Sequence, residues 1–262
     1  MVTMVKLSPS RANDFQNCPL LFRFRTIDQL PEPLSIDAVR GTIVHTTLEH
    51  LYDLPAVERQ LPQAYELWRE AFAEISQNEK YRELFDAIED ISVWSNESLF
   101  LLDKYFALEE PVLLEPAERE SHIEFDLQDG FKIHGYVDRI DVAPSGEIRI
   151  VDYKTGKSPR EGYEQKAFFQ LRFYALIIWR TRNIVPRKLR LIYLGDGRIL
   201  EDSPTENDLI ATEKKIVAIW KAMEAAFDSK NFPPKKSKLC DWCAHQSLCP
   251  EFGGTPPPLP LP

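Results

Sequence analysis

A change in hydrophobic period after Pro116 most constrains what this chain can fold into. Before Pro116, apolar residues recur at helical spacing within 39–52 and 63–107, so each segment is expected to bury one stripe of a helix. After it, apolar and polar residues alternate within 122–127, 131–142 and 148–154, which is typical of strands. The sequence therefore predicts a helical lobe at about 55–110 and a sheet-containing core at about 116–228.

The remaining segments complete a predicted α/β (α+β) fold, in which a central mixed sheet is flanked by helices. Ser8-Pro9 is a favourable helix start, which predicts a helix from Arg11 to about Cys18. Turn residues at 129–130 and 144–146 make an antiparallel meander the economical arrangement of the three strands. Further elements are expected as a helix at about 162–182, a strand at 188–194 and a helix at 205–228.

Residues 1–252 are expected to form one domain, followed by a tail of different composition. The tail, 253–262, consists almost entirely of Gly, Pro and Leu, and it is expected to be disordered because it cannot pack. No segment approaches the apolar length of a membrane helix, and the first six residues lack the pattern of a secretion signal. We therefore expect a cytoplasmic protein with no membrane partner.

The charge of the chain is unevenly distributed, which bears on nucleic-acid binding. The net charge of −9 looks unfavourable for a DNA-binding protein. Residues 154–198, however, contain eleven Lys or Arg and three Asp or Glu, a local excess of +8 that leaves −17 for the rest. DNA therefore remains a possible partner of this basic segment. The acidic residues between Glu66 and Glu120 are interpreted as a solvated helical face without a partner.

Two acidic residues and a lysine form the candidate catalytic group. Asp138 follows one apolar strand, and Asp152 and Lys154 lie two residues apart on the next, so the last two share a face. Strand pairing can bring Asp138 beside them. Two converging carboxylates repel each other unless a cation lies between them, and Mg²⁺ or Mn²⁺ prefers such oxygen ligands. That ion would polarise a phosphodiester and activate water, and Lys154 would hold the water or neutralise charge on the phosphate.

A simpler interpretation is that Asp152 and Lys154 form a surface ion pair. Isolated pairs of this kind are common and contribute little. Here both Asp138 and Asp152 follow the apolar runs of buried strands, where an unpaired charge is costly. This context favours a metal site.

Four cysteines form a second candidate site. Cys240, Cys243 and Cys249 lie within ten residues, and Cys18 is at the opposite end of the chain. In a reducing compartment disulfides are disfavoured. Zinc sites of four cysteines usually consist of two close pairs, whereas three clustered cysteines ending in Cys-Pro, with one remote, fit a [4Fe–4S] cluster better. We expect residues 232–252 and Cys18 to form this iron–sulfur segment, with Lys235, Lys236 and Lys238 available to DNA.

Four motifs in order resemble one nuclease family. They are Arg40–Glu49 (RGTIVHTTLE), Gly135–Asp141 (GYVDRID), Val151–Gly156 (VDYKTG) and Gln170-x-x-x-Tyr174. Together they resemble the RecB-family exonuclease branch of the PD-(D/E)XK nucleases, which have a restriction-endonuclease-like core. Cas4 and the AddB nuclease domain are relatives, some with an iron–sulfur cluster. The resemblance covers nearly the whole chain, and the ordered set is specific where one motif alone would be weak.

The resemblance implies a role for each matching residue of the catalytic centre. It implies His45 as a metal ligand from a helix, Asp138 and Asp152 as carboxylate ligands, and the backbone carbonyl of Tyr153 as a further ligand. Lys154 corresponds to the catalytic lysine.

Three other residues are candidates for supporting roles. Glu49 lies on the same helical face as His45. Gln170 and Tyr174, one helical turn apart, could contact DNA phosphates or support Lys154, although simple helix packing explains Tyr174 nearly as well.

The leading hypothesis is thus an enzyme, a Mg²⁺- or Mn²⁺-dependent deoxyribonuclease. The resemblance implies an exonuclease acting on single-stranded DNA or DNA ends in repair, recombination or DNA processing. One alternative is a non-catalytic DNA-binding or assembly module of a repair complex, and another is a redox sensor that uses the cysteine cluster. A helicase or repair partner is compatible with the sequence, but the chain has no ATP-binding loop of its own.

Overall fold

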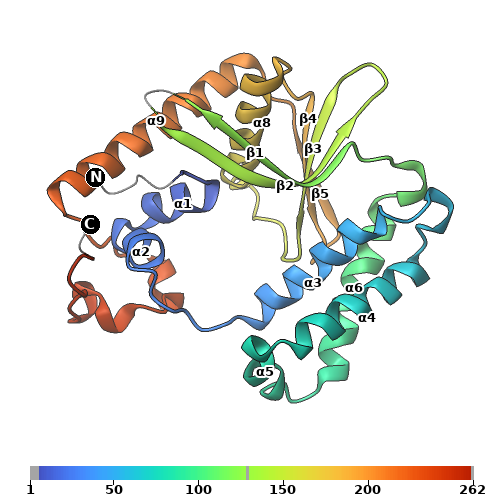
Figure 1. Cartoon of the computed structure of the whole chain (residues 1–262), viewed down its shortest axis with the longest axis horizontal. Coiled ribbons are helices and arrows are strands. Elements are labelled where there is room, and N and C mark those ends of the chain that lie inside the picture. The colour runs from blue at the N-terminus through green and yellow to red at the C-terminus, as the bar shows by residue number, and fades with distance from the viewer. Residues whose placement is uncertain (1–5, 128–129, 261–262) are drawn as a thin grey trace. The chain divides into compact units, whose positions relative to one another are not determined.

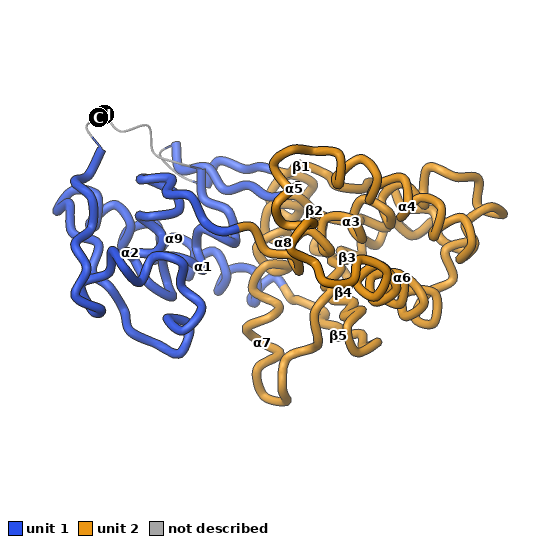
Figure 2. Tube along the Cα trace, turned by 90° about the horizontal axis from the view of Figure 1, so that it is seen from below, with its two compact units in different colours: residues 1–33, 124–135, 206–262 blue, residues 34–123, 136–205 orange. Residues whose placement is uncertain are grey.

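The computed structural model describes residues 6–127 and 130–260 of the chain (Figure 1). It divides into two compact units. Unit 1 is formed by residues 1–33, 124–135 and 206–262, and unit 2 by residues 34–123 and 136–205 (Figure 2). Each unit is described below by itself. The turn expected at 129–130 lies partly outside the described residues.

Five strands form one mixed sheet in chain order (Figure 1). They are β1 (Glu118–Asp126), β2 (Lys132–Val142), β3 (Ile148–Lys154), β4 (Lys188–Tyr193) and β5 (Arg198–Asp202). β2 and β3 are antiparallel, β3 and β4 are parallel, and β4 and β5 are antiparallel. The predicted neighbouring order of the first three strands is confirmed. The sequence analysis missed β5, although Gly195-Asp-Gly197 supplies turn residues just before it.

In unit 2, four helices cover one face of the sheet. They are α3 (Ile36–Leu51), α4 (Leu61–Gln77), α5 (Glu79–Asp86) and α6 (Ile91–Leu108), and they occupy the segments where a helical period was found. Val39, Val44 and Leu48 of α3 share a buried apolar cluster with Val151 and Tyr153 of β3. This cluster fixes which side of β3 faces the helices.

The other side of β3 faces α7 (Glu164–Ala167) and α8 (Phe169–Arg182). Where one helix was predicted at 162–182, the structure has two, with Phe168 between them. α8 provides the crossover that parallel strands β3 and β4 require. Because successive side chains of a strand point to opposite faces, Asp152 and Lys154 lie on the α8 side when Tyr153 lies on the other.

Unit 1 contains both ends of the described chain. α1 (Pro9–Asn17) is capped by Ser8, whose Oγ accepts a hydrogen bond from the Arg11 N–H at 3.4 Å. α2 (Pro19–Phe22) runs into a π-helical turn, Arg23–Ile27, and α9 (Glu206–Ser229) is the longest helix. Aromatic pairs hold these elements together, among them Phe22 with Phe227. Three short 3₁₀ turns follow, Lys238–Trp242, Gln246–Leu248 and Pro250–Phe252.

The described part of the tail, 253–260, has no regular secondary structure but contacts the rest of unit 1. The Arg23 guanidinium donates a hydrogen bond to the Pro257 carbonyl, and the Gly254 N–H donates to the Cys249 carbonyl. These residues are therefore anchored where the sequence analysis expected a disordered tail, because backbone carbonyls can be held by hydrogen bonds without an apolar core. Residues 261–262 lie outside the described residues. None of the described helices is long and apolar enough to cross a membrane.

Candidate active site and cysteine site

The candidate active site begins where β2 and β3 separate. Their backbone pairing ends with Arg139 opposite Val151, one residue before Asp138 and Asp152 would meet. Instead of continuing the ladder, the Asp138 side chain accepts a hydrogen bond from the Tyr153 N–H, with Oδ2 at 2.7 Å from the nitrogen. The carboxylate is thus fixed to the backbone of the neighbouring strand.

Three side chains from α3, β1 and β2 form a possible metal site. Nδ1 of His45 lies 3.5 Å from Oδ2 of Asp138 and 3.9 Å from Oε1 of Glu120. Among the described residues, this is the group of His, Cys, Asp and Glu whose ligand atoms all lie within 4.8 Å of one another. Two carboxylates and an imidazole suit a divalent ion such as Mn²⁺ or Mg²⁺. The donor chemistry therefore fits the ion expected from the sequence.

Asp152 lies against Lys154. Its carboxylate is almost fully buried and lies 2.6 Å from Nζ of Lys154, and it does not belong to the close group formed by His45, Glu120 and Asp138. Its negative charge nevertheless acts on both His45 and Asp138. The backbone pairing of β2 and β3 ends before Asp138 and Asp152, which a hairpin pattern in the sequence does not reveal.

The surroundings of Asp138 change the pKa of its carboxyl group strongly. Burial, and after it the negative charge of Asp152, raise the pKa of Asp138 to about 7. Burial by itself would lower the pKa of His45, but Glu120, Asp138 and Asp152 outweigh it and raise that pKa. The raised pKa values favour the protonated forms of Asp138 and His45 when no metal ion is bound, and binding of an ion would release these protons.

Lys154 is held between Asp152 and α8. Its Nζ donates to Oε1 of Gln170 at 2.9 Å, and Nε2 of Gln170 donates to the hydroxyl of Tyr174 at 3.0 Å. Gln170 was a candidate either for contact with DNA phosphates or for support of Lys154. The hydrogen bond to Nζ is the contact expected for the second role. Burial alone would lower the pKa of Lys154, yet Asp152 raises it above its usual value. The amine is therefore a permanent cation at neutral pH.

Glu120 was missed by the sequence analysis, which placed it in a solvated helical face. It lies within β1, and its φ of 41° distinguishes it from ordinary strand residues. A positive φ is unusual for a residue other than Gly and interrupts the alternation of a strand. No sequence period could therefore place this side chain beside His45. The corrected interpretation makes Glu120 a candidate ligand.

A buried ionic network lies on the opposite side of β3. The Arg139 guanidinium is 1% exposed and binds Glu109 through two hydrogen bonds of 2.7 and 3.0 Å. It also donates to the hydroxyl of Tyr153 at 2.7 Å. Since Asp138 and Arg139 are adjacent on β2, the network and the Asp138–Tyr153 hydrogen bond fix both strands at the point where they diverge.

A cleft opens beside the possible metal site. It is lined by Gly41, Thr42, His45, Thr46, Glu49, Glu120 and Tyr136. Glu49 thus shares the cleft with His45 and Glu120 but does not belong to the close group of possible ligands.

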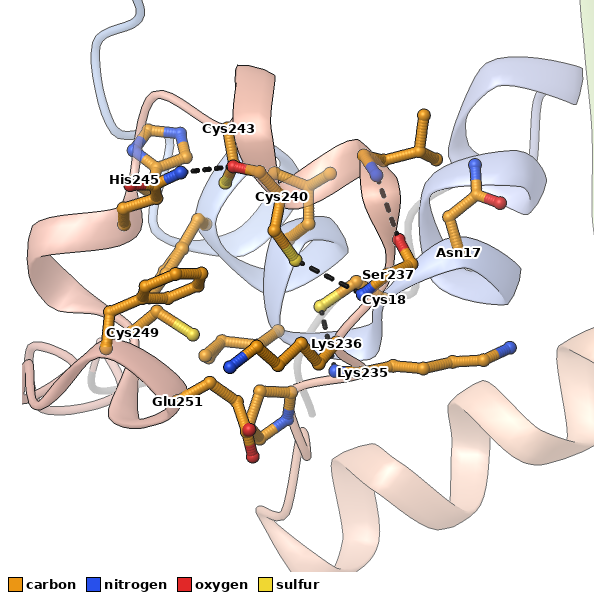
Figure 3. Close-up of a pocket in the computed structure, with 17 residues that line it drawn as sticks. Asn17, Cys18, Lys235, Lys236, Ser237, Cys240, Cys243, His245, Cys249 and Glu251 are labelled. Atoms are coloured by element: carbon orange, nitrogen blue, oxygen red, sulfur yellow. Dashed lines mark hydrogen bonds between the residues drawn. The ribbon is translucent and has the colours of Figure 1, made fainter.

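The four cysteines line one pocket in unit 1. Figure 3 shows Cys18 from the N-terminal helical segment opposite Cys240, Cys243 and Cys249 from the C-terminal turns. The backbone N–H of Lys235 donates to Sγ of Cys18, and that of Ser237 to Sγ of Cys240, both at 3.4 Å. Burial and, to a smaller extent, the three other cysteines raise the pKa of Cys249.

Comparisons with known proteins show the family to which the chain belongs. The family model described as the PD-(D/E)XK nuclease superfamily matches residues 6–250. The chain is 25% identical to the Gene 69 protein of Mycobacterium phage D29 over 96% of the chain and 100% of that protein. It is 30% identical to the Gene 69 protein of Mycobacterium phage L5 over 47% of the chain and 41% of that protein.

One solved structure has a similar fold across most of the chain. It is a protein of Eubacterium rectale described as "Putative exonuclease", with a TM-score of 0.57 and 14% identity. The match covers 92% of this chain and 87% of that one.

Proposed function

Because the chain belongs to the PD-(D/E)XK nuclease superfamily, we propose that it hydrolyses DNA phosphodiester bonds with the help of a divalent metal ion. The observation that carries the proposal is the convergence of His45, Glu120 and Asp138 beside the Asp152–Lys154 pair. A structural ion pair would not need a second buried acid whose pKa is raised to about 7.

His45, Glu120 and Asp138 are proposed to hold Mg²⁺ or Mn²⁺, with Asp152 and the Tyr153 carbonyl as the further ligands implied by the family resemblance. Such an ion, when bound, polarises the phosphodiester and makes water a better nucleophile. The N–H of Tyr153 keeps the Asp138 carboxylate in position for this role.

Lys154 is proposed to act as a charged hydrogen-bond donor. Its raised pKa keeps Nζ protonated at neutral pH, so it cannot accept the proton of the attacking water. It can instead orient that water or neutralise the charge that develops on the phosphate. Asp152 and Gln170 hold the amine from two sides and restrict where it can point.

The substrate is proposed to be single-stranded DNA or DNA ends, cut exonucleolytically during repair, recombination or DNA processing. This part rests on the resemblance of the motifs to the RecB-family branch, with Cas4 and the AddB nuclease domain. A helicase or another repair protein would supply such ends. The excess of basic residues in 154–198 supports binding to a polyanion.

The cysteine site is proposed to hold a [4Fe–4S] cluster with Cys18, Cys240, Cys243 and Cys249 as ligands. Its support is the shared pocket, the sequence pattern of three clustered cysteines and one remote cysteine, and the two backbone N–H groups that donate to sulfurs. Its proposed role is structural, because it would join α1–α2 to the C-terminal turns of unit 1.

The deciding experiment is a cleavage assay on end-labelled single- and double-stranded DNA with Mg²⁺ or Mn²⁺. We expect Lys154→Ala to slow cleavage by about 10²- to 10³-fold while circular dichroism and the melting temperature stay close to wild type. Lys80→Ala, a change of an exposed lysine in α5, is the matched control and should cleave normally.

Two results would contradict the proposal. Equal cleavage by wild type and Lys154→Ala would remove the lysine from the mechanism. DNA binding without metal-dependent cleavage by wild type would favour the non-catalytic DNA-binding or assembly module instead.

A further inference from the structure

The cleft beside the possible metal site contains an exposed aromatic ring. Tyr136 is 58% exposed and lies two residues before Asp138 on β2, so both side chains are on the same face of the strand. Its ring contacts that of His122 of β1, with centroids 4.9 Å apart and planes tilted by 47°. One face of an apolar ring is thus presented to the cleft next to a candidate metal ligand.

The charge of the cleft determines which part of a nucleic acid can enter it. Its lining includes the carboxylates of Glu49 and Glu120 but neither Lys nor Arg among the described residues. The carboxylate of Glu49 disfavours a phosphate beside it. An uncharged base would not be repelled, and its N–H groups could donate to a carboxylate.

Part of the cleft is lined by small residues. Gly41, Thr42 and Thr46 of α3 present only small side chains to it. These residues leave the cleft less filled than longer side chains would, which favours the entry of a base beside the Tyr136 ring.

We propose that this cleft binds one unpaired nucleobase next to the scissile phosphate, with Tyr136 stacking on the base and Glu49 accepting a hydrogen bond from it. This inference rests on the proposed function and names its substrate as single-stranded DNA. The N–H donors in question lie on the Watson–Crick edge, which a duplex occupies by pairing. The cleft therefore selects a base that is already unpaired.

The first test is a set of single-stranded oligonucleotides, each with one abasic residue at a different position. Wild type should cleave slowly only where the abasic residue lies at a fixed distance from the bond to be cut. Tyr136→Ala should lose this dependence and cut intact DNA with kcat/KM lower by roughly 10- to 100-fold, mainly through a higher KM. Tyr136→Phe keeps the ring and should remain close to wild type.

Phe100→Ala is the matched control. Phe100 of α6 is 56% exposed in the same unit but does not line the cleft, so its loss should leave kcat/KM unchanged. The base-binding proposal is overturned if wild type ignores the abasic residue at every position, or if Tyr136→Ala and Phe100→Ala have equal effects on cleavage and binding.

A binding measurement separates this inference from the proposed nuclease activity. Fluorescence anisotropy of labelled single-stranded and duplex DNA, with Ca²⁺ in place of Mg²⁺, reports binding whether or not cleavage occurs. Weaker single-strand binding by Tyr136→Ala, with wild type unable to cut in Mg²⁺ or Mn²⁺, would support the base site and overturn the nuclease. If wild type cleaves normally with the metal ion and Tyr136→Ala binds single-stranded DNA as tightly as wild type, the nuclease activity would be supported and the base site overturned.

Discussion

The candidate active site and the cysteine site differ in how much of each is built before any metal ion binds. In the active site, Asp138 and Asp152 lie on adjoining strands, and each already has a partner, the Tyr153 N–H or the Lys154 amine. In the cysteine site, Cys240, Cys243 and Cys249 lie in or beside short 3₁₀ turns, and all four thiols are partly exposed. The fold therefore preorganises the carboxylates, whereas we expect the cysteine segment, if it holds the proposed cluster, to depend more on that cluster for order.

The largest effect is expected from a substitution in the candidate active site, where the carboxylates are held in place before a metal ion binds. Asp138→Asn should reduce DNA cleavage by about 10³-fold, because the amide loses the charge that holds the ion. The fold should persist, with a melting temperature at pH 8 equal to or above that of wild type, since a repulsive buried charge is removed. Asp126→Asn, at the exposed end of β1, is the control and should retain full activity. Unimpaired cleavage by Asp138→Asn would contradict the assigned role.

The cysteine site should respond in the opposite way, by losing its structure along with its occupant. Cys243→Ser should lower the iron content from about four per chain towards zero, remove the broad visible absorption and make the protein poorly soluble. Iron analysis and limited proteolysis of residues 232–260 measure the two effects. A brown variant with full iron content would show that Cys243 is not a ligand. If analysis of the wild-type protein finds one equivalent of zinc and no iron, the four cysteines form a zinc site and the proposed cluster is wrong.

The pH dependence of metal binding sharpens the comparison at the active site. Asp138, with a pKa of about 7, and His45, with a raised pKa, must lose their protons to bind an ion. Affinity for Mn²⁺, measured by calorimetry, should therefore rise with pH through about 7, by up to tenfold per pH unit for each proton released. Glu120→Gln should weaken binding at every pH, since it removes a candidate ligand. A pH-independent affinity would be evidence against Asp138 as a ligand.

The same shifts predict how the metal-free protein responds to pH. Because the folded-state pKa values of both groups are raised, the folded protein holds protons that the unfolded chain has already released. The contribution of Asp138 to stability is therefore present at low pH and is lost as pH rises from about 4 through 7, whereas that of His45 is lost at higher pH, above the usual pKa of 6.5. Adding Mn²⁺ at pH 8 should restore the lost melting temperature, which differential scanning calorimetry can measure.

The smallest effect is expected at the support of the lysine. Gln170→Ala removes one hydrogen bond from Nζ of Lys154 but leaves Asp152 in place, so kcat should fall only a few-fold, by about 10-fold at most. Tyr174→Phe, which removes the hydroxyl that orients Gln170, should have a still smaller effect. A loss as large as that of Lys154→Ala would mean that Gln170 contacts the substrate directly.

The sequence alone determined most of the elements and the superfamily, and it supplied the candidate site residues. Hydrophobic periods of 3.6 and 2 located the helical lobe, the first four strands and α8–α9, because burial of one face leaves a local trace in the chain. Polar residues at the ends of apolar strands identified Asp138, Asp152 and Lys154, and the cysteine spacing indicated a metal centre. The motif order was enough to indicate the superfamily that the comparisons then showed.

Only the tertiary structure decided which of these groups share a site. The divergence of β2 from β3 placed Asp138 against the Tyr153 N–H and left Asp152 to Lys154. The positive φ of Glu120 brought a third acid beside His45, although its sequence neighbourhood reads as an exposed acidic run. Contacts of this kind depend on backbone paths that are set by packing between distant segments, and a local pattern of residues does not record them.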